Sequence, residues 1–428
     1  MSLRIGVDGF NLALSKGTGV ATYARTLTRT LHHMGHSVDM IFGLDLPNSS
    51  NIDLREVQFF EALEQPAIRN PKLLSKQWLN DRKIDIFSPS IQEIPFTGRV
   101  EVRQFAEKFP YFDRIFNSDG IFRKAARYFR RTGKMMNICM DNPPDIMHWT
   151  YPFPIKLSGS KNIYTIHDVV PLKLPYTTLD NKVFYFRLIK EISKKSDGIC
   201  TVSKSSINDI ISFFPESRKK IYNTYQCSNF FEFNQRRGDA ECISQVKANF
   251  GLTPRSYFIF FGSLEPKKNI GRLIEAFLAS GSRRKLVLVG AQSWKSEKEL
   301  RYLDHGVKNK KIILIEYLPE NALFALLRLS RALLFPSLSE GFGLPVLEAM
   351  NSGVPTLISN EGALPEVGGE ASLTTDAYDV DAIAKAIFTL EHDDALCDKL
   401  IAAGHVQAAQ FDMASYCKRL GELYHSVY

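Results

Sequence analysis

The sequence FPSLSEGFGLPVLEAM, residues 335–350, has the composition of a turn that joins a buried strand to a helix. Its two glycines allow the backbone to approach a bound ligand closely. Pro345 suits the first helical turn, where a missing N–H costs nothing, and Gly353 ends the helix. Because a helix N-terminus carries partial positive charge, a phosphate can bind there. Taken alone, the stretch fits equally well a tight turn in which Glu340 is solvated and no ligand binds.

The chain from residue 257 onward alternates short apolar runs with helical stretches. The expected strands are rich in Val, Ile, Leu and Phe and cover residues 257–261, 285–289, 311–315, 332–335 and 355–358. The expected helices begin near residues 269, 297, 320, 344, 379 and 395. Strands that alternate with helices of about ten residues are typical of a doubly wound parallel sheet.

The first forty residues predict a similar strand, loop and helix. A short β-run covers 3–8, the loop Gly17-Thr18-Gly19 opens a helical stretch that continues to Met34, and a second apolar run covers 38–42. Further strand-like runs are found at 145–149, 162–166 and 198–202. The stretch between about 45 and 145 follows no clear period, and we interpret it as an elaboration of the first domain.

The chain length indicates two domains, because 428 residues are about two to three times the common domain size. We therefore predict an α/β protein with two Rossmann-like, doubly wound domains that face an interdomain cleft. The polar, weakly periodic stretch 231–254 is interpreted as the linker between residues 1–230 and residues 255–410. The last helix, 411–428, is expected to cross back to the N-terminal domain.

The composition narrows the class of protein further. With 44% hydrophobic and 23% charged residues, the chain is neither largely disordered nor fibrous. It has no apolar run long enough to span a bilayer, and its N-terminus lacks the pattern of a secretory signal. The six cysteines are scattered without a CxxC pair, which favours reduced thiols in a cytoplasmic protein over structural zinc.

The net charge of +8 is concentrated in one segment, residues 102–135, which contains nine Lys or Arg and three acidic residues. Aromatic residues lie between these cations. Three interpretations stay open: a helical excursion whose aromatics pack into the first domain, peripheral contact with an anionic membrane, or nucleic-acid binding. We regard nucleic-acid binding as the weakest of the three.

Several motifs together resemble the family 4 glycosyltransferases, which are retaining, nucleotide-sugar-dependent enzymes of the GT-B fold. The strongest is the Glu-x7-Glu element formed by Glu340 and Glu348, followed by GVP and ALPEVGGEA. The resemblance continues in FGSLEPKKNIGRLIEAF (261–277), YTIHD (164–168), GTGVATY (17–23) and GHSV (35–38). It covers the whole C-terminal domain and parts of the first.

The resemblance implies roles for individual residues in binding the donor. Glu348 would hold the ribose hydroxyls of the nucleotide, Glu340 the hydroxyls of the transferred sugar, and Lys268 the diphosphate. The backbone amides of the turn would contact sugar and diphosphate; these residues are Gly341, Phe342, Gly343 and Leu344. Ser263 and Lys267 are also expected to bind the donor. Many relatives carry an arginine where this chain has Ser263, so Lys267, Lys268 or Arg272 must supply more of the positive charge.

The first domain contributes two candidate elements. His167 follows the strand 162–166, which places it at the carboxyl edge of the sheet, where ligands bind in such folds. In similar enzymes this histidine lies against the transferred sugar, and the departing phosphate is usually described as taking the acceptor proton. The resemblance thus makes His167, Glu340 and Lys268 the expected catalytic residues. The loop Gly17-Thr18-Gly19 is similar to an acceptor or phosphate loop, although a tight turn alone also explains its glycines.

The sequence therefore predicts a retaining hexosyltransferase of polysaccharide biosynthesis, similar to bacterial mannosyltransferases, with GDP-mannose as the favoured donor. Residues 1–230 would bind a glycan or polyprenyl-diphosphate-linked acceptor, and residues 255–410 the nucleotide sugar. No metal is expected, and Asp379-Val380-Asp381 is interpreted as a helix cap. We expect a cytoplasmic protein, peripheral to the inner face of the plasma membrane if residues 102–135 bind lipid. The alternatives are a sugar-nucleotide epimerase, a non-catalytic nucleotide-sugar-binding relative and a nucleic-acid-binding module.

Overall fold

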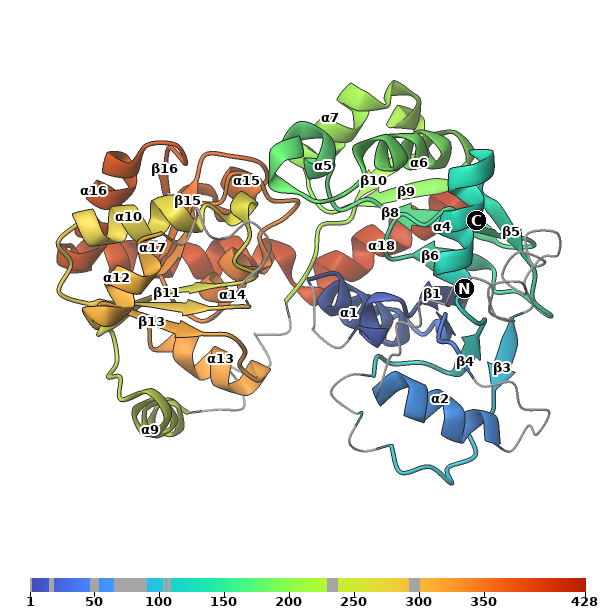
Figure 1. Ribbon diagram of the computed structural model, residues 1–428, viewed down its shortest axis with the longest axis horizontal. Helices are drawn as coiled ribbons and strands as arrows, with labels where there is room; N and C mark the ends of the chain where they lie inside the picture. The colour runs from blue at the N-terminus through green and yellow to red at the C-terminus, as the bar shows by residue number, and fades with distance from the viewer. Residues whose placement is uncertain are drawn as a thin grey trace.

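The computed structural model describes residues 2–14, 19–46, 54–64, 91–102, 105, 109–228, 238–291 and 301–428. Two α/β bodies lie side by side, one blue to green and one yellow to red (Figure 1). Each contains a predominantly parallel sheet with helices packed against it. The predicted pair of doubly wound, Rossmann-like domains is confirmed.

Among the described residues, the N-terminal body has an eight-stranded sheet with the order β10-β9-β8-β6-β1-β2-β4-β3. All neighbouring strands are parallel except β3 and β4. The strands are β1 (Arg4–Asp8), β2 (Ser37–Phe42), β3 (Gln92–Ile94), β4 (Arg114–Asn117), β6 (Ile146–Trp149), β8 (Lys161–Thr165), β9 (Gly198–Thr201) and β10 (Ile221–Asn223). A separate pair consists of β5 (Met136–Ile138) and β7 (Ile155–Leu157). Because the chain passes from β1 to β2 on one side and returns to β6 on the other, the strand order reverses at β1, where such folds bind ligands.

The helices of this body pack apolar faces against the sheet. They are α1 (Gly19–His33), α2 (Arg55–Glu64), α4 (Ile121–Thr132), α5 (Val170–Lys173), α6 (Lys182–Lys195) and α7 (Lys204–Phe213). Helix α1 shows why they form: Tyr23, Leu27 and Leu31 recur at helical spacing and are buried. Ser203 precedes helix α7 as its N-cap, and its hydroxyl accepts from the Ser206 N–H.

The sheet of the C-terminal body has the order β13-β12-β11-β14-β15-β16. Its strands are β11 (Tyr257–Phe261), β12 (Lys285–Val289), β13 (Ile312–Ile315), β14 (Leu333–Phe335), β15 (Thr356–Ser359) and β16 (Ser372–Thr375). All neighbours are parallel. Strands such as YFIFF and KLVLV are continuous apolar runs because helices cover both faces of a parallel sheet. The predicted strands are confirmed to within about one residue, and β16 is additional.

The remaining helices are α9 (Asp239–Phe250), α10 (Ile270–Ala279), α12 (Leu303–Lys308), α13 (Glu320–Arg328), α14 (Leu344–Asn351), α15 (Leu364–Gly368), α16 (Val380–His392), α17 (Asp394–Ala408) and α18 (Met413–Val427). They include those predicted near residues 269, 320, 344, 379, 395 and 411, while α9 and α15 were not predicted. The helix start expected near residue 297 lies outside the described residues. Asp379 caps α16 by accepting from the Ala382 N–H at 2.9 Å, so the capping interpretation of its triplet is confirmed for this residue.

The expected linker 231–254 is not irregular throughout. Residues 239–250 form α9, which contacts α13 and buries Cys242 and Val246. The sequence pattern missed this helix because few of its residues are buried, so its apolar period is weak. Residues 231–237 lie outside the described part of the chain.

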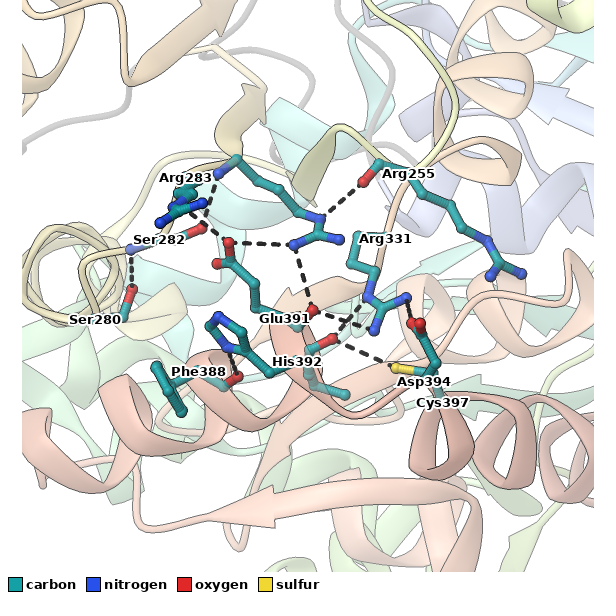
Figure 2. A network of polar contacts seen from close by, with 12 residues as sticks. Arg255, Ser280, Ser282, Arg283, Arg331, Phe388, Glu391, His392, Asp394 and Cys397 are labelled. Carbon is teal, nitrogen blue, oxygen red and sulfur yellow. Dashed lines mark hydrogen bonds and ion pairs between the residues drawn. The ribbon is translucent and has the colours of Figure 1, made fainter.

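A buried arginine network ties the α16–α17 corner to the start of the C-terminal sheet (Figure 2). Arg331 donates to the Leu390 carbonyl at 2.7 Å and to Asp394 at 2.5 Å. Glu391 pairs with Arg284 at 3.2 Å and accepts from the backbone N–H of Arg283 at 3.0 Å. Arg331 is only 3% exposed, so its hydrogen bonds compensate the loss of hydration that burial imposes. This network lies at the amino edge of the sheet and stabilises the fold.

The final helix α18 contacts α1 and β9 of the N-terminal body. Figure 1 shows it, in red, running from the C-terminal body beneath the green strands. Tyr424 on α18 is buried, and its hydroxyl lies 2.7 Å from His148 Nδ1 at the end of β6. His148 Nε2 lies 2.8 Å from the Thr165 hydroxyl, so both ring nitrogens have partners. Burial lowers the pKa of His148 to about 3, which keeps this imidazole neutral.

Four of the eight aromatic side chains of segment 102–135 are buried in the N-terminal body, whereas Tyr111 is 37% exposed. Phe116, Phe122 and Phe129 are each less than 10% exposed, and Phe105 is also buried. The cations Arg114 and Arg123 pair with Asp39 and Asp45. Packing of aromatics into the first domain, one of the three interpretations of this segment, is therefore confirmed for Phe105, Phe116, Phe122 and Phe129.

Candidate active site

The turn after β14 forms a loop and helix start at the carboxyl edge of the C-terminal sheet. Helix α14 begins at Leu344, as predicted, with Pro345 in its first turn. Gly343 precedes it with φ 104°, a conformation that L side chains rarely adopt, so glycine is required there. No acidic residue lies in the first turn of α14, which leaves the positive end of the helix available to an anion.

Two of the predicted donor-binding residues contact each other directly. Lys268 ends the short 3₁₀ turn Pro266–Lys268 after β11, and its Nζ lies 2.6 Å from Glu340 Oε1. The side chains are 12% and 9% exposed. Lys268 Nζ also lies 5.0 Å from the centre of the Phe335 ring. The carboxyl ends of β11 and β14, which are neighbours in the sheet, thus bring an acid and a base together.

Lys267 lies among three carboxylates. Burial alone would lower its pKa, but Asp168, Glu265 and Glu340 raise the pKa of Lys267 above its ordinary value. It is therefore a fixed cation near neutral pH. Its closest partner is Glu265, with Nζ to Oε1 at 3.6 Å. Because Asp168 belongs to the N-terminal body, Lys267 also connects the two bodies electrostatically.

The side chains of Ser263 and Arg272 are both engaged with other partners than Glu340. The Ser263 hydroxyl donates to Glu265 at 3.0 Å. Arg272 donates to Asn269 at 3.0 Å and lies over the Tyr378 ring. Lys267, Lys268 and Arg272 were the predicted replacements for the missing arginine. Lys268 pairs with Glu340, and Lys267 lies close enough for the charge of Glu340 to raise its pKa.

Glu348 lies in the second turn of α14 and is 8% exposed. Burial, together with the nearby charge of Glu320, raises the pKa of Glu348 from 4.5 to about 8. A buried carboxyl group with such a pKa is a recognised sign of a functional site. Arg25 on α1 lies close enough to Glu320 for its pKa to respond to that charge, although burial is the main influence and lowers it. The sequence did not single out Arg25 or Glu320, because only the fold brings them together.

His167 lies just beyond β8 at the carboxyl edge of the N-terminal sheet, as predicted. Its Nε2 lies 3.0 Å from the Thr150 carbonyl, and because a carbonyl can only accept, Nε2 carries the proton. The Tyr23 ring packs edge-on against the imidazole, with ring centres 4.8 Å apart. Burial lowers the pKa of His167, so the neutral ring has Nδ1 unprotonated at neutral pH.

His167 and the donor loop meet where the two bodies touch. A side chain at position 341 would place its Cβ 2.6 Å from the His167 carbonyl oxygen, so only glycine permits this approach. The Ser206 hydroxyl lies 2.9 Å from the His167 carbonyl and 3.3 Å from that of Gly341. The structure therefore brings His167 to the residues 340–344 that the sequence predicts for the donor.

The N-terminal glycine loop is described only in part. Gly17 and Thr18 lie outside the described residues, and Gly19 is the first residue of α1. In the part of the chain that the structure covers, no group of three or more His, Cys, Asp or Glu side chains is arranged to hold a metal ion. None of the described helices is both long and apolar enough to cross a membrane.

Comparison with known proteins agrees with this geometry. Residues 245–407 match the family described as glycosyl transferases group 1. The O-antigen chain mannosyltransferase B of Escherichia coli is 33% identical over 58% of this chain and 66% of its own length. The serotype-specific mannosyltransferase WbdA of Escherichia coli is 31% identical over 62% of this chain and 34% of its own length. The matched part thus spans less than two thirds of these relatives.

Similarity of structure covers the whole chain. The crystal structure of Anabaena Alr3699/HepE in complex with UDP and glucose aligns with a TM-score of 0.65 at 14% identity, over 99% of this chain and 100% of that chain. The predicted GT-B fold is confirmed. The chain has the GT-B fold, and its C-terminal body contains the residues that match the glycosyl transferases group 1 family. Its sequence is similar to bacterial O-antigen mannosyltransferases, and the resemblance stated from the motifs is confirmed.

Proposed function

We propose that this protein is a retaining mannosyltransferase that moves mannose from GDP-mannose to a glycan or polyprenyl-diphosphate-linked acceptor in polysaccharide biosynthesis. The observation that carries this proposal is the contact between the bodies: the backbone at Gly341, which directly follows Glu340 of the Glu340–Lys268 pair, lies against the His167 carbonyl. The names of the relatives, which are mannosyltransferases of O-antigen chains, support the choice of sugar and pathway.

In this proposal the C-terminal body, residues 255–410, binds the donor. The positive end of α14 and the backbone amides of residues 341–344 bind the diphosphate, with Lys267 and Lys268 as cations. Glu340 accepts hydrogen bonds from hydroxyls of the mannose, and Lys268 holds its carboxylate in place. Glu348 binds the ribose hydroxyls from within α14. No metal ion is required, because fixed cations and amides stabilise the developing diphosphate charge.

Residues 1–230 bind the acceptor in this proposal. The acceptor hydroxyl attacks the anomeric carbon from the face that the diphosphate leaves, so the configuration is retained. The bond from the anomeric carbon to the phosphate oxygen breaks, the bond to the acceptor oxygen forms, and the departing phosphate takes the acceptor proton. Neutral His167 borders this reaction centre, and its Nδ1 can accept a hydrogen bond from a sugar hydroxyl.

The proposal includes contact with an anionic membrane, where a polyprenyl-linked acceptor would be located. Helix α4 supports it, since its apolar residues pack inward and its C-terminal end exposes Arg130, Arg131 and, just beyond, Lys134. Clustered Lys and Arg residues near a bilayer favour anionic lipid. The inner face of the plasma membrane is the location that this proposal assigns.

The direct test is release of nucleoside diphosphate by the purified chain from a panel of GDP- and UDP-sugars, with lipid or glycan extract as acceptor. Release from GDP-mannose that depends on the acceptor, and that Glu340→Ala abolishes, supports the proposal. Conversion of the sugar without release of GDP would indicate an epimerase. Binding of the nucleotide sugar without turnover of any donor would indicate a non-catalytic relative.

A further inference from the structure

A carboxylate of the C-terminal body reaches into the N-terminal body and caps one of its helices. Glu366 on α15 accepts from the backbone N–H of Lys204 with both oxygens at 3.0 Å, and from that of Ser205 at 3.2 Å. These N–H groups belong to the first turn of α7, where an anion is stabilised by the helix dipole. In Figure 1 the labels α15 and α7 lie on the two sides of this junction.

The same carboxylate holds a tyrosine at the end of the N-terminal sheet. The Tyr225 hydroxyl donates to Glu366 Oε1 at 2.5 Å. Tyr225 follows β10 and has φ 56°, a left-handed conformation that is uncommon for a bulky residue. Asn223 secures it by accepting from the Tyr225 N–H at 2.8 Å. A residue in such a strained conformation persists only where contacts with the surrounding structure stabilise it. Residues of this kind are found preferentially at ligand-binding sites and in switch regions.

The Tyr225 ring connects this contact to the donor loop. Its centre lies 6.3 Å from that of Phe342, the residue between the two glycines of the loop, and 5.2 Å from that of Phe411. The Arg419 guanidinium lies 4.8 Å from the Tyr225 ring centre. A shift of the Tyr225 ring therefore alters the packing of Phe342 in the loop that precedes α14.

The capped helix α7 in turn positions His167. Its residue Ser206 has its hydroxyl 2.9 Å from the His167 carbonyl and 3.3 Å from that of Gly341. The contact of Glu366 with α7 lies one residue before Ser206. Holding the start of α7 against the C-terminal body thus also holds the His167 backbone beside Gly341.

We propose that Glu366 and Tyr225 are positioning residues that latch the two bodies together and keep His167 against the donor loop. This inference rests on the proposed function for its catalytic consequence, but the latch itself is a property of the free protein. Neither residue contacts the reacting atoms. Their effect is on the fraction of molecules in which the two halves of the site are assembled, and only that fraction turns over.

The test uses Glu366→Gln and Tyr225→Phe in the full chain. The glutamine retains size but loses the charge that the start of α7 stabilises, and the phenylalanine loses only the hydroxyl while retaining the ring contacts. The matched controls are Glu370→Gln, an exposed carboxylate on the same segment, and Tyr222→Phe on β10. Three quantities are measured: the radius of gyration by small-angle X-ray scattering, the affinity for GDP, and kcat.

We expect Glu366→Gln and Tyr225→Phe to increase the radius of gyration and to lower kcat by about tenfold, the factor that loss of a charge-assisted hydrogen bond implies. The affinity for GDP is expected to stay within about twofold, because the residues that bind it are unchanged. The double variant should lose little more than Glu366→Gln alone, since both changes break one contact.

Two results would overturn the inference: an unchanged radius of gyration in both variants, or a loss of GDP affinity as large as the loss of kcat. The second result would place Glu366 in donor binding. If the wild-type chain transfers no sugar, the proposed function fails while the scattering experiment still decides whether the latch exists. If the wild type is active and both variants match their controls, the latch alone fails.

Discussion

Lys268 Nζ lies 2.6 Å from Glu340 Oε1 in a part of the molecule that is largely shielded from solvent. Each side chain neutralises the other, and removal of one leaves the other as a poorly solvated charge. In the proposed function, the pair holds both groups in place before a donor binds, so little reorganisation is needed when diphosphate charge develops.

Replacement of Lys268 by alanine is expected to lower kcat for sugar transfer by about 100-fold, because one fixed cation is lost from the leaving group. The measurement is the rate of GDP release with acceptor present. Lys385→Ala, which removes an exposed lysine on α16, is the control and should match the wild type. A Lys268→Ala variant within about threefold of wild-type kcat would exclude the proposed role.

Gly341→Ala tests the approach of the two bodies. The added methyl group would lie 2.6 Å from the His167 carbonyl oxygen, so the bodies must separate to admit it. We expect kcat to fall by at least about tenfold, because a displacement of that order misaligns the reacting groups. Gly238→Ala is the control, because a Cβ there meets nothing within 4 Å. Normal turnover by Gly341→Ala, with an unchanged melting temperature, would contradict the described contact.

Protonation of Glu348 is expected to couple to nucleotide binding. With a pKa of about 8, this carboxyl group is mostly protonated at pH 7 in the free protein. Two ribose hydroxyls that donate to it favour the ionised form, so binding of GDP lowers its pKa and releases a proton. The affinity for GDP should therefore rise as pH increases toward 8 and level off above it.

Calorimetry at pH 7 in buffers of different ionisation enthalpy measures this proton release. Glu348→Gln should abolish the buffer dependence and weaken GDP binding. The stability of the free protein has the opposite pH dependence to the affinity for GDP. Because the pKa of Glu348 is raised in the folded state, its contribution to the free energy of unfolding is fully present below pH 4.5 and is lost as pH rises to about 8. An affinity for GDP that is independent of pH and buffer would refute the assignment of Glu348 to the ribose.

Tyr424→Phe tests how α18 is attached to the N-terminal body. The change removes the partner of His148 Nδ1, which is fully buried. We expect the free energy of unfolding to fall by about 1–3 kcal/mol, the cost of leaving a buried polar group unpaired. Urea denaturation measures it, with Tyr428→Phe, at an exposed position, as control. Equal stability of the two variants would show that the buried hydrogen bond contributes nothing.

Contact with a membrane is tested on helix α4. Charge reversal in Arg130→Glu with Lys134→Glu should reduce co-sedimentation with phosphatidylglycerol vesicles by at least about tenfold, since each basic residue near the surface contributes about 1 kcal/mol. Lys308→Glu with Lys310→Glu reverses two exposed charges on the C-terminal body and serves as control. Equal binding by both double variants would rule out α4 as the membrane-contacting surface.

The sequence predicted much of the C-terminal body and its site, because that information is local. Apolar strand runs, Pro345 and the glycines each determine nearby structure, and the carboxyl ends of adjacent parallel strands then bring Glu340 and Lys268 together. His167 was placed correctly for the same reason, as a residue that follows a parallel strand.

What the sequence did not predict depends on contacts between distant segments. Nothing local to Glu366 or Tyr225 reveals that they meet, and Arg25 approaches Glu320 only after both bodies have folded. The strand β4 was missed because its few apolar residues lie in a charged segment. Whether the aromatics around it face lipid or the core could be decided only from their burial.

The central claim is transfer of mannose with retention, and the most direct measurement follows the sugar itself. The purified chain is incubated with isotopically labelled GDP-mannose and lipid-linked acceptor, and the product is characterised by NMR of its anomeric carbon. The account predicts labelled mannose in the acceptor with the α configuration of the donor, and none with Glu340→Ala. Mannose in the β configuration, or label that remains on GDP as another sugar, would contradict it.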